Sequence, residues 1–157
     1  MTATSHALIG ASIASIISNP IIGLPIAFAS HFAADLVPHW DAGTNHRKKT
    51  KLKLAVESAF DVILGFALVF LIFRNLASPT YLFFMVIAAQ LPDWLKTPSD
   101  IFGLDIPPFS WMDYLSHKLQ NRMQLPWGLV TQIVVVGAIV ALSLSTKNAD
   151  SFLAFRY

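Results

Sequence analysis

The stretch SHFAADLVPHWD, residues 30–41, decides how this chain folds. It closes an apolar segment and places His31 and Asp35 four residues apart, so that both side chains project from one face of a helix. The proline that follows cannot continue this helix, and it turns His39 and Asp41 back over the same helix end. Because charged groups next to hydrocarbon are costly, this run calls for a chemical or structural explanation.

The composition around this run is typical of a membrane protein. Of the 157 residues, 55% are hydrophobic and 13% are charged, and the mean hydropathy is +0.58. Several apolar stretches approach the length of about 20 residues that a spanning helix needs. We therefore predict a single all-α integral membrane domain, residues 1–157. A chain of this length has no room for a separate soluble catalytic domain, so any site must be built from helix ends and short loops.

The apolar segments predict a polytopic helical bundle of about five spans. The first two segments are short and are separated by Asn19-Pro20, so the bundle should begin with a short helical hairpin, whose small residues let its arms pack closely. A polar stretch, residues 96–124, is predicted to be an interfacial loop that contains an amphipathic segment. The predicted spans are residues 5–18, 21–37, 54–73, 79–95 and 125–144.

The basic residues predict the orientation. The strongest basic run is HRKKTKLK at residues 46–53, and Lys96, Lys118 and Arg122 follow the fourth predicted span. By the positive-inside rule both regions face the cytoplasm, as expected for a protein of the cytoplasmic (inner) membrane. The basic run adjoins a span, which favours membrane lipids with anionic headgroups as partners and indicates no nucleic-acid role.

This topology brings most acids and histidines of the chain to the cytoplasmic face. The chain has no cysteine, so a metal ion would be bound by imidazole, carboxylate and water. Such donors suit a divalent ion such as Zn²⁺, Mn²⁺ or Mg²⁺. We therefore predict a metal site at the cytoplasmic surface, with its ligands among His6, His31, Asp35, His39 and Asp93.

The remaining polar residues of this face are candidates for catalysis and substrate binding. Asp61 or Glu57, four residues apart, is expected to orient a water molecule or act as general base. Arg47 and His117 are expected to contact an anionic headgroup or a phosphoester substrate.

Three short motifs resemble the bacterial inner-membrane metal-dependent hydrolase family: SHALIGASIASI at residues 5–16, DLVPHWD at 35–41 and LPDW at 91–94. The resemblance covers the chain to about residue 95. It implies a compact helical membrane protein with a His and Asp metal centre and a hydrolytic activity, on a phosphoester. On matching positions it assigns the metal centre to His6, His31, Asp35, His39 and Asp93. Where members often have a second histidine after an HR-containing loop, this chain reads HRKKTK, with Lys51.

Three function classes are compatible with these patterns. We favour a membrane-embedded metal-dependent hydrolase that acts on a phosphoester or lipid-like substrate. The alternative is a structural or assembly protein whose polar residues only tie helix ends together. A small ion transporter is a second alternative, although transport sites normally lie near the bilayer midplane and these residues lie at one edge. The sequence does not indicate an oligomeric state.

Overall fold

The protein is all-α over the residues that the structure describes, which confirms the predicted fold class. The structure is a computed structural model that describes residues 1–45 and 48–154, with side chains described outside 100–102 and 148–154. The described helices are α1 (Ala3–Ile16), α2 (Pro20–Asp35), α3 (Lys51–Phe73), α4 (Pro79–Phe102), α5 (Phe109–Leu119) and α6 (Trp127–Ala154).

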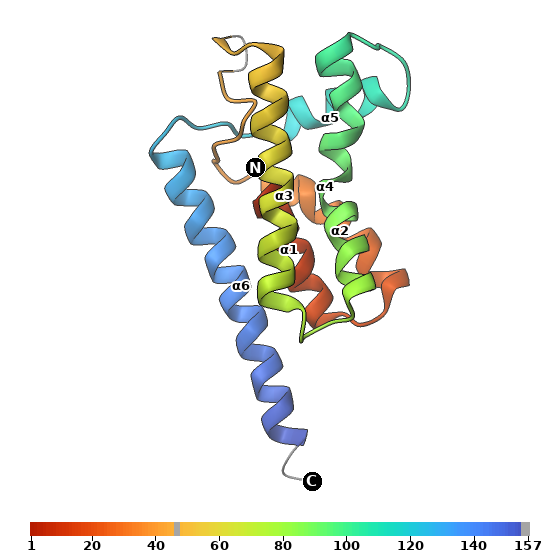
Figure 1. Cartoon of the computed structure of the whole chain (residues 1–157), viewed down its shortest axis with the longest axis vertical. Coiled ribbons are helices and arrows are strands. Elements are labelled where there is room, and N and C mark those ends of the chain that lie inside the picture. The colour runs from red at the N-terminus through yellow and green to blue at the C-terminus, as the bar shows by residue number, and fades with distance from the viewer. Residues whose placement is uncertain (46–47, 155–157) are drawn as a thin grey trace.

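The connections between the helices differ at the two ends of the bundle. Figure 1 shows the α1–α2 and α3–α4 connections at the lower end, and α5 with the α2–α3 loop in the upper half. The start of α1 and the end of α2 lie beside the middle of α3 and α4, which extend further upward. A site formed where α1 begins and α2 ends is therefore enclosed by α3 and α4.

The helix α1 is central, because it contacts α2, α3, α4 and α6. Its side chains Ala7, Ala11 and Ala14 are buried. At Gly10 an added Cβ would lie only 2.9 Å from the Met85 carbonyl oxygen of α4. The small residues that predict a close α1–α2 hairpin thus allow close packing against several helices.

The helix α4 is longer than the sequence predicts. The predicted span of this segment ends at residue 95, just before Thr97-Pro98, whereas α4 continues to Phe102. A proline removes one helical hydrogen bond, and here the chain keeps its helical course through both Pro92 and Pro98. The helix stops instead at Gly103, whose φ of 66° is a left-handed conformation that glycine adopts without strain.

Two helices among the described residues are long and apolar enough to cross a membrane: α3 and the part Trp127–Lys147 of α6. They correspond to the predicted spans 54–73 and 125–144. The helix α1 is apolar but shorter, at 14 residues. The other three predicted spans remain predictions.

The predicted interfacial loop, residues 96–124, contains the end of α4 and the separate helix α5. Trp111 and Tyr114 of α5 are 70% and 69% exposed. A helix with exposed aromatic side chains is therefore present in this segment; its place at a membrane interface remains a prediction.

Candidate metal centre

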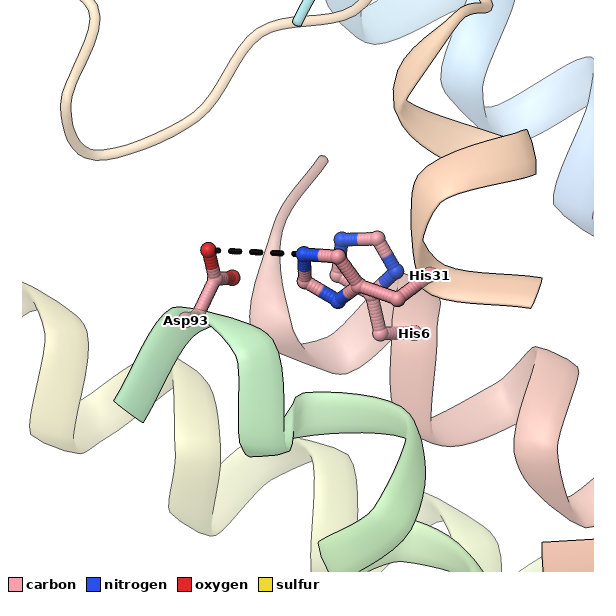
Figure 2. Close-up of side chains that lie close together, drawn as sticks. All are labelled: His6, His31 and Asp93. Carbon is pink, nitrogen blue, oxygen red and sulfur yellow. Dashed lines mark ion pairs between the residues drawn. The ribbon is translucent and has the colours of Figure 1, made fainter. Parts of the chain in front are cut away.

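Two histidines and an aspartate from three helices meet in the interior. His6 lies near the start of α1, His31 near the end of α2, and Asp93 in α4 (Figure 2). One possible ligand atom of each residue lies within 4.8 Å of the others. The imidazole rings of His6 and His31 stack with their centroids 3.8 Å apart. These three residues, called the metal group below, can hold a metal ion.

Asp35 lies against both histidines of the metal group. Its Oδ1 is 3.3 Å from His6 Nε2, and its Oδ2 is 3.5 Å from His31 Nε2. His31 Nε2 is also 3.6 Å from Asp93 Oδ1. Two ligands that bind a tetrahedral ion at about 2.0–2.1 Å lie about 3.3 Å from each other. These three pairs of atoms are therefore spaced about as ligands of one small ion would be.

The hydrogen bond of His31 leaves its second ring nitrogen without a partner. His31 Nδ1 lies 2.8 Å from the Ala89 carbonyl oxygen, so in the neutral ring Nδ1 carries the proton and donates it. Nε2 then presents a lone pair toward carboxylate oxygens, and it makes no hydrogen bond. A buried lone pair that faces carboxylates is unfavourable unless a proton or a metal cation lies between them. His6 Nε2 is likewise buried without a hydrogen bond.

Pro92 lies one helical turn after this acceptor. Proline has no N–H, so the Ala88 carbonyl oxygen, next to that of Ala89, lacks its helical hydrogen bond. The motif LPDW at residues 91–94 therefore supplies Asp93 and also weakens α4 in the turn that contains the acceptor of His31.

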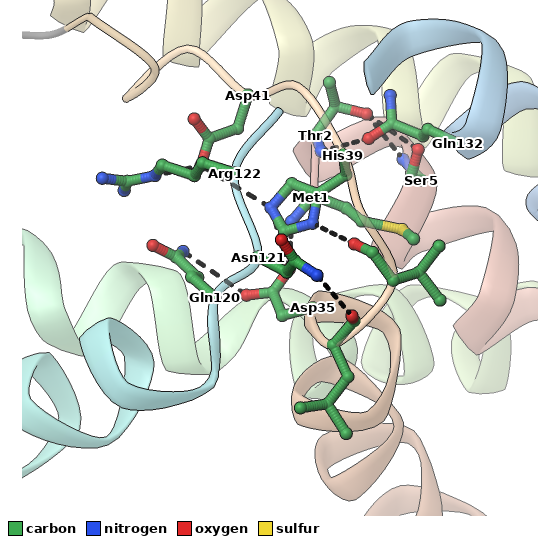
Figure 3. A network of polar contacts seen from close by, with 12 residues as sticks. Met1, Thr2, Ser5, Asp35, His39, Asp41, Gln120, Asn121, Arg122 and Gln132 are labelled. Atoms are coloured by element: carbon green, nitrogen blue, oxygen red, sulfur yellow. Dashed lines mark hydrogen bonds and ion pairs between the residues drawn. The ribbon is translucent and has the colours of Figure 1, made fainter. Parts of the chain in front are cut away.

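His39 and Asp41 lie close to Asp35, in the loop after α2 (Figure 3). His39 Nε2 is 3.6 Å from Asp35 Oδ1 and 4.0 Å from Asp41 Oδ2. His39 Nδ1 is 2.7 Å from the Val37 carbonyl oxygen. Burial lowers the pKa of His39, which favours the neutral ring. The nitrogen of Met1 also contacts Asp35 Oδ1.

The segment after α5 holds this loop in place. The His39 N–H donates to the Asn121 carbonyl oxygen at 3.0 Å, and the Met123 N–H donates to the His39 carbonyl oxygen at 2.7 Å. The side chain of Gln120 lies 3.4 Å from Asp35 Oδ2. Residues more than 80 positions apart in the chain therefore fix the position of His39.

Two cationic side chains lie at the edge of this cluster. The sequence indicated these two residues only as evidence for the orientation of the chain in the membrane. Lys96 Nζ is 2.6 Å from Asp93 Oδ1, and Arg122 Nε is 3.2 Å from Asp41 Oδ2. Burial lowers the pKa of Lys96, but the carboxylates of Asp93, Asp35 and Asp41 together raise it more, so the net pKa is above its ordinary value. Burial raises the pKa of Asp41, but Arg122, the N-terminus and the Thr44 hydroxyl bond, with others, together lower it more, so the net pKa is below its ordinary value. Both side chains are therefore held in their charged forms.

Sequence reasoning had one signal for Lys96, which follows Asp93 by three residues and so shares its helix face. It had none for Arg122, which approaches Asp41 only through the fold.

The two candidates for general base have structural partners. The carboxylate of Asp61 accepts hydrogen bonds from the Ala3 N–H at 2.5 Å, the Thr4 N–H at 3.1 Å and the Thr4 hydroxyl at 2.6 Å. It therefore satisfies N–H groups at the start of α1. Glu57 accepts from Lys49 Nζ at 2.5 Å. Their catalytic roles remain predictions.

Of the two candidates for substrate contact, the structure describes one, and this residue lies outside the cluster. His117 is exposed on α5, and its Nδ1 is 2.9 Å from Asp113 Oδ1. Arg47 lies outside the described residues, so the structure says nothing of its position.

A cavity of about 310 Å³ adjoins the metal group between α3, α4 and the loop after α2. Asp41, Asp61, Asp93, Lys96 and Arg122 are among its lining residues. A larger cavity of about 500 Å³ is lined by parts of α1, α2 and α4 near the opposite end of the bundle, mostly by apolar side chains such as Leu24. Of these two cavities, the smaller one is lined by charged side chains.

Comparison of the chain with protein-family models, with curated proteins and with solved structures finds no match. The case for a functional site therefore rests on the geometry of the side chains.

Proposed function

We propose that this chain is a membrane-embedded hydrolase that binds a divalent metal ion in the metal group and acts on a phosphoester. The observation that carries the proposal is the buried Nε2 lone pair of His31, which faces Asp35 and Asp93 without a hydrogen bond. A cation among these atoms would remove the electrostatic conflict and use the observed ligand spacing.

The donors favour Zn²⁺ over the other candidate ions. His6 and His31 offer imidazole nitrogens, and Asp93 and Asp35 offer carboxylate oxygens. Zn²⁺ accepts this mixture in a tetrahedral site, whereas Mg²⁺ prefers oxygen ligands in an octahedral site. A divalent ion bound here would supply Lewis-acid chemistry, by polarising a phosphoryl oxygen and by lowering the pKa of a bound water.

Side chains and backbone groups of the protein would supply the general base and position the histidines. Asp61 is better placed than Glu57 to act as general base, because Asp61 lines the cavity beside the metal group. The Ala89 carbonyl oxygen fixes the tautomer of His31, and residues 120–123 hold the loop that carries His39. With α3 and α6 in a membrane and the basic loops inside, the site faces the cytoplasm, where a lipid-like substrate can approach along the bilayer.

One observation favours the structural alternative. Asp61 bonds to the start of α1, and Asp35 contacts groups from three parts of the chain, so the same acids also tie elements together. A structural protein needs these contacts and does not need a metal ion.

Metal analysis of the protein purified in mild maltoside detergent tests the proposal. We expect wild type to retain a stoichiometric amount of Zn²⁺ and the His31→Ala and Asp93→Asn variants to lose it while keeping their helical circular dichroism. His117→Ala is the matched control and should retain the ion, because His117 is exposed on α5 and its Nδ1 lies at Asp113 of the same helix. Absence of bound metal in wild type supplied with Zn²⁺ or Mn²⁺ would overturn the proposal.

Hydrolysis then separates the two function classes. We expect the metal-loaded protein to release alcohol from phosphoesters, and the His31→Ala variant to be inactive. A loaded protein that hydrolyses no phosphoester from a panel of soluble and lipid substrates supports the structural alternative.

A further inference from the structure

The cavity beside the metal group has a cationic wall that the metal site alone does not require. Its volume of about 310 Å³ is at the lower end of the range of about 300–1,000 Å³ found for small-molecule sites. Lys96 reaches it from α4 and Arg122 from the connection between α5 and α6. Lys96 is only 9% exposed, so its charge is directed at the interior and not at solvent.

The loop after α2 is shaped around the guanidinium of Arg122. An added Cβ at Gly43 would lie 2.9 Å from Arg122 Nη2 and 3.4 Å from Arg122 Cζ. Only glycine allows the loop and the guanidinium to lie this close without displacement. Asp41 then orients the guanidinium through its Nε, at 3.2 Å.

The charges of the cavity depend on the metal ion. Its lining includes three carboxylates, Asp41, Asp61 and Asp93, and two cationic side chains; Met1, whose N-terminal ammonium contacts Asp35, also lines it. Without a metal ion the positive and negative groups of the lining therefore balance, and no excess of positive charge attracts an anion. A divalent ion on Asp93 adds two positive charges and makes the lining net positive. Lys96 Nζ lies 2.6 Å from Asp93 Oδ1, so its charge is next to a residue that would hold the ion.

Part of the wall formed by α3 is apolar. Leu54 and Val62 line the cavity beside Ser58 and Asp61 of the same helix, and Trp94 of α4, which is 38% exposed, also lines it. A ligand with a phosphate at Lys96 and an alkyl chain at α3 would match both walls. A soluble sugar phosphate would leave hydroxyl groups against Leu54 and Val62 without partners.

We propose that Lys96 and Arg122 form a phosphate-binding subsite that fills only when the metal ion is bound, and that the substrate is an amphiphilic phosphoester with its alkyl part along α3. This inference rests on the proposed function, because the metal ion supplies the charge that admits the phosphate. Binding of metal and phosphate is then coupled, and each tightens the other.

Equilibrium dialysis with radiolabelled inorganic phosphate tests the subsite on the full chain in maltoside detergent. We expect the zinc-loaded protein to bind phosphate at least about tenfold more tightly than the zinc-free protein, as coupling free energies typically allow. Lys96→Gln keeps a hydrogen-bond donor near Asp93 but removes the charge, and it should weaken phosphate binding at least about tenfold. The combined variant Arg122→Met with Asp41→Asn removes a charged pair together and should have a similar effect.

Lys53→Gln is the matched control. Its side chain is 64% exposed, and its Nζ lies 3.9 Å from Glu57, away from the cavity lining. It should leave phosphate binding unchanged, and all variants should retain zinc. Loss of zinc in Lys96→Gln, or phosphate binding that is equal with and without zinc, would overturn the proposal.

Butyl phosphate distinguishes a lipid-like substrate from free phosphate. In competition with the radiolabelled phosphate, butyl phosphate should bind about tenfold more tightly, because its methylene groups are removed from water. Leu54→Asn should reduce this advantage without affecting phosphate itself. Equal affinities for the two ligands in wild type would contradict the amphiphilic substrate. If wild type retains zinc but binds no phosphate, this inference fails and the proposed metal site stands; if it retains no zinc, the proposed function fails first.

Discussion

At the scale of single residues, Asp61 belongs to the predicted site, and its carboxylate accepts hydrogen bonds from backbone N–H groups of α1. Its spacing of four residues from Glu57 places both on one face of α3. The structure gives them different partners, since Glu57 contacts Lys49 and Asp61 contacts the first residues of α1. The position of His6 in α1 thus depends on Asp61.

Replacement of this carboxylate should therefore lower stability. We expect Asp61→Asn to reduce the free energy of unfolding by about 1–3 kcal/mol, because hydrogen bonds from Ala3 and Thr4 lose a charged acceptor. Glu57→Gln, which weakens a half-exposed ion pair, should cost less than about 1 kcal/mol. Unfolding in mixed detergent followed by circular dichroism measures both. Unchanged stability in Asp61→Asn together with lost hydrolysis would instead assign Asp61 a purely catalytic role.

Some of the site could be predicted from residues alone. The spacing of His31 and Asp35 and the turn at Pro38 follow from helix geometry, and the hairpin predicts that His6 lies near Asp35, as the distance of 3.3 Å confirms. The acceptor of His31 could not be predicted, because a backbone carbonyl such as that of Ala89 has no sequence signal. The approach of Arg122 also depends on a long-range contact.

At the scale of helices, the packing of α1 against α4 depends on the lack of a side chain at Gly10. We expect Gly10→Ala to lower the free energy of unfolding by about 1–3 kcal/mol, because its Cβ would lie 2.9 Å from both the Met85 carbonyl oxygen and the Ala89 Cβ. The same change should weaken zinc retention, since Ala89 also accepts the hydrogen bond of His31.

Gly137 in α6 provides the control, because nothing lies within 4 Å of a Cβ added there. Gly137→Ala should be neutral or stabilise the helix by up to about 1 kcal/mol, the difference in helix propensity. Equal effects of the two substitutions on unfolding would show that the α1–α4 contact is not tight.

The sequence predicts the existence of these helices better than their ends. The end of α2 follows from Pro38, which the helix does not reach. At Pro98 the same reasoning fails, because a proline only weakens a helix and the surrounding contacts decide whether it continues. Tertiary packing of this kind has no local signal.

At the scale of the whole molecule, the question is how many helices cross the bilayer. The helices α1 and α2 have 14 and 16 residues. At about 1.5 Å per residue they span roughly 21–24 Å, less than the hydrocarbon thickness of about 30 Å. They lie against longer neighbours, and α3 and α6 meet the criteria for spans on their own. A thinned bilayer or a hairpin that enters from one side would accommodate the short pair.

Single cysteines distinguish these arrangements, because the chain has no cysteine of its own. We expect cysteines at Lys53 and Lys118 to react with a membrane-impermeant maleimide only from the cytoplasm, since they lie with the basic loops near the site. Cysteines at Asn19 and Arg74, in the connections at the opposite end, should react only from outside. All four positions are exposed, so labelling after permeabilisation controls for reactivity. If Asn19 reacts from the cytoplasm while Arg74 reacts from outside, α3 and α4 cross the bilayer and the α1–α2 hairpin does not. The metal group would then lie at the bottom of a pocket that opens from the cytoplasm, and it would still be within reach of a lipid phosphate.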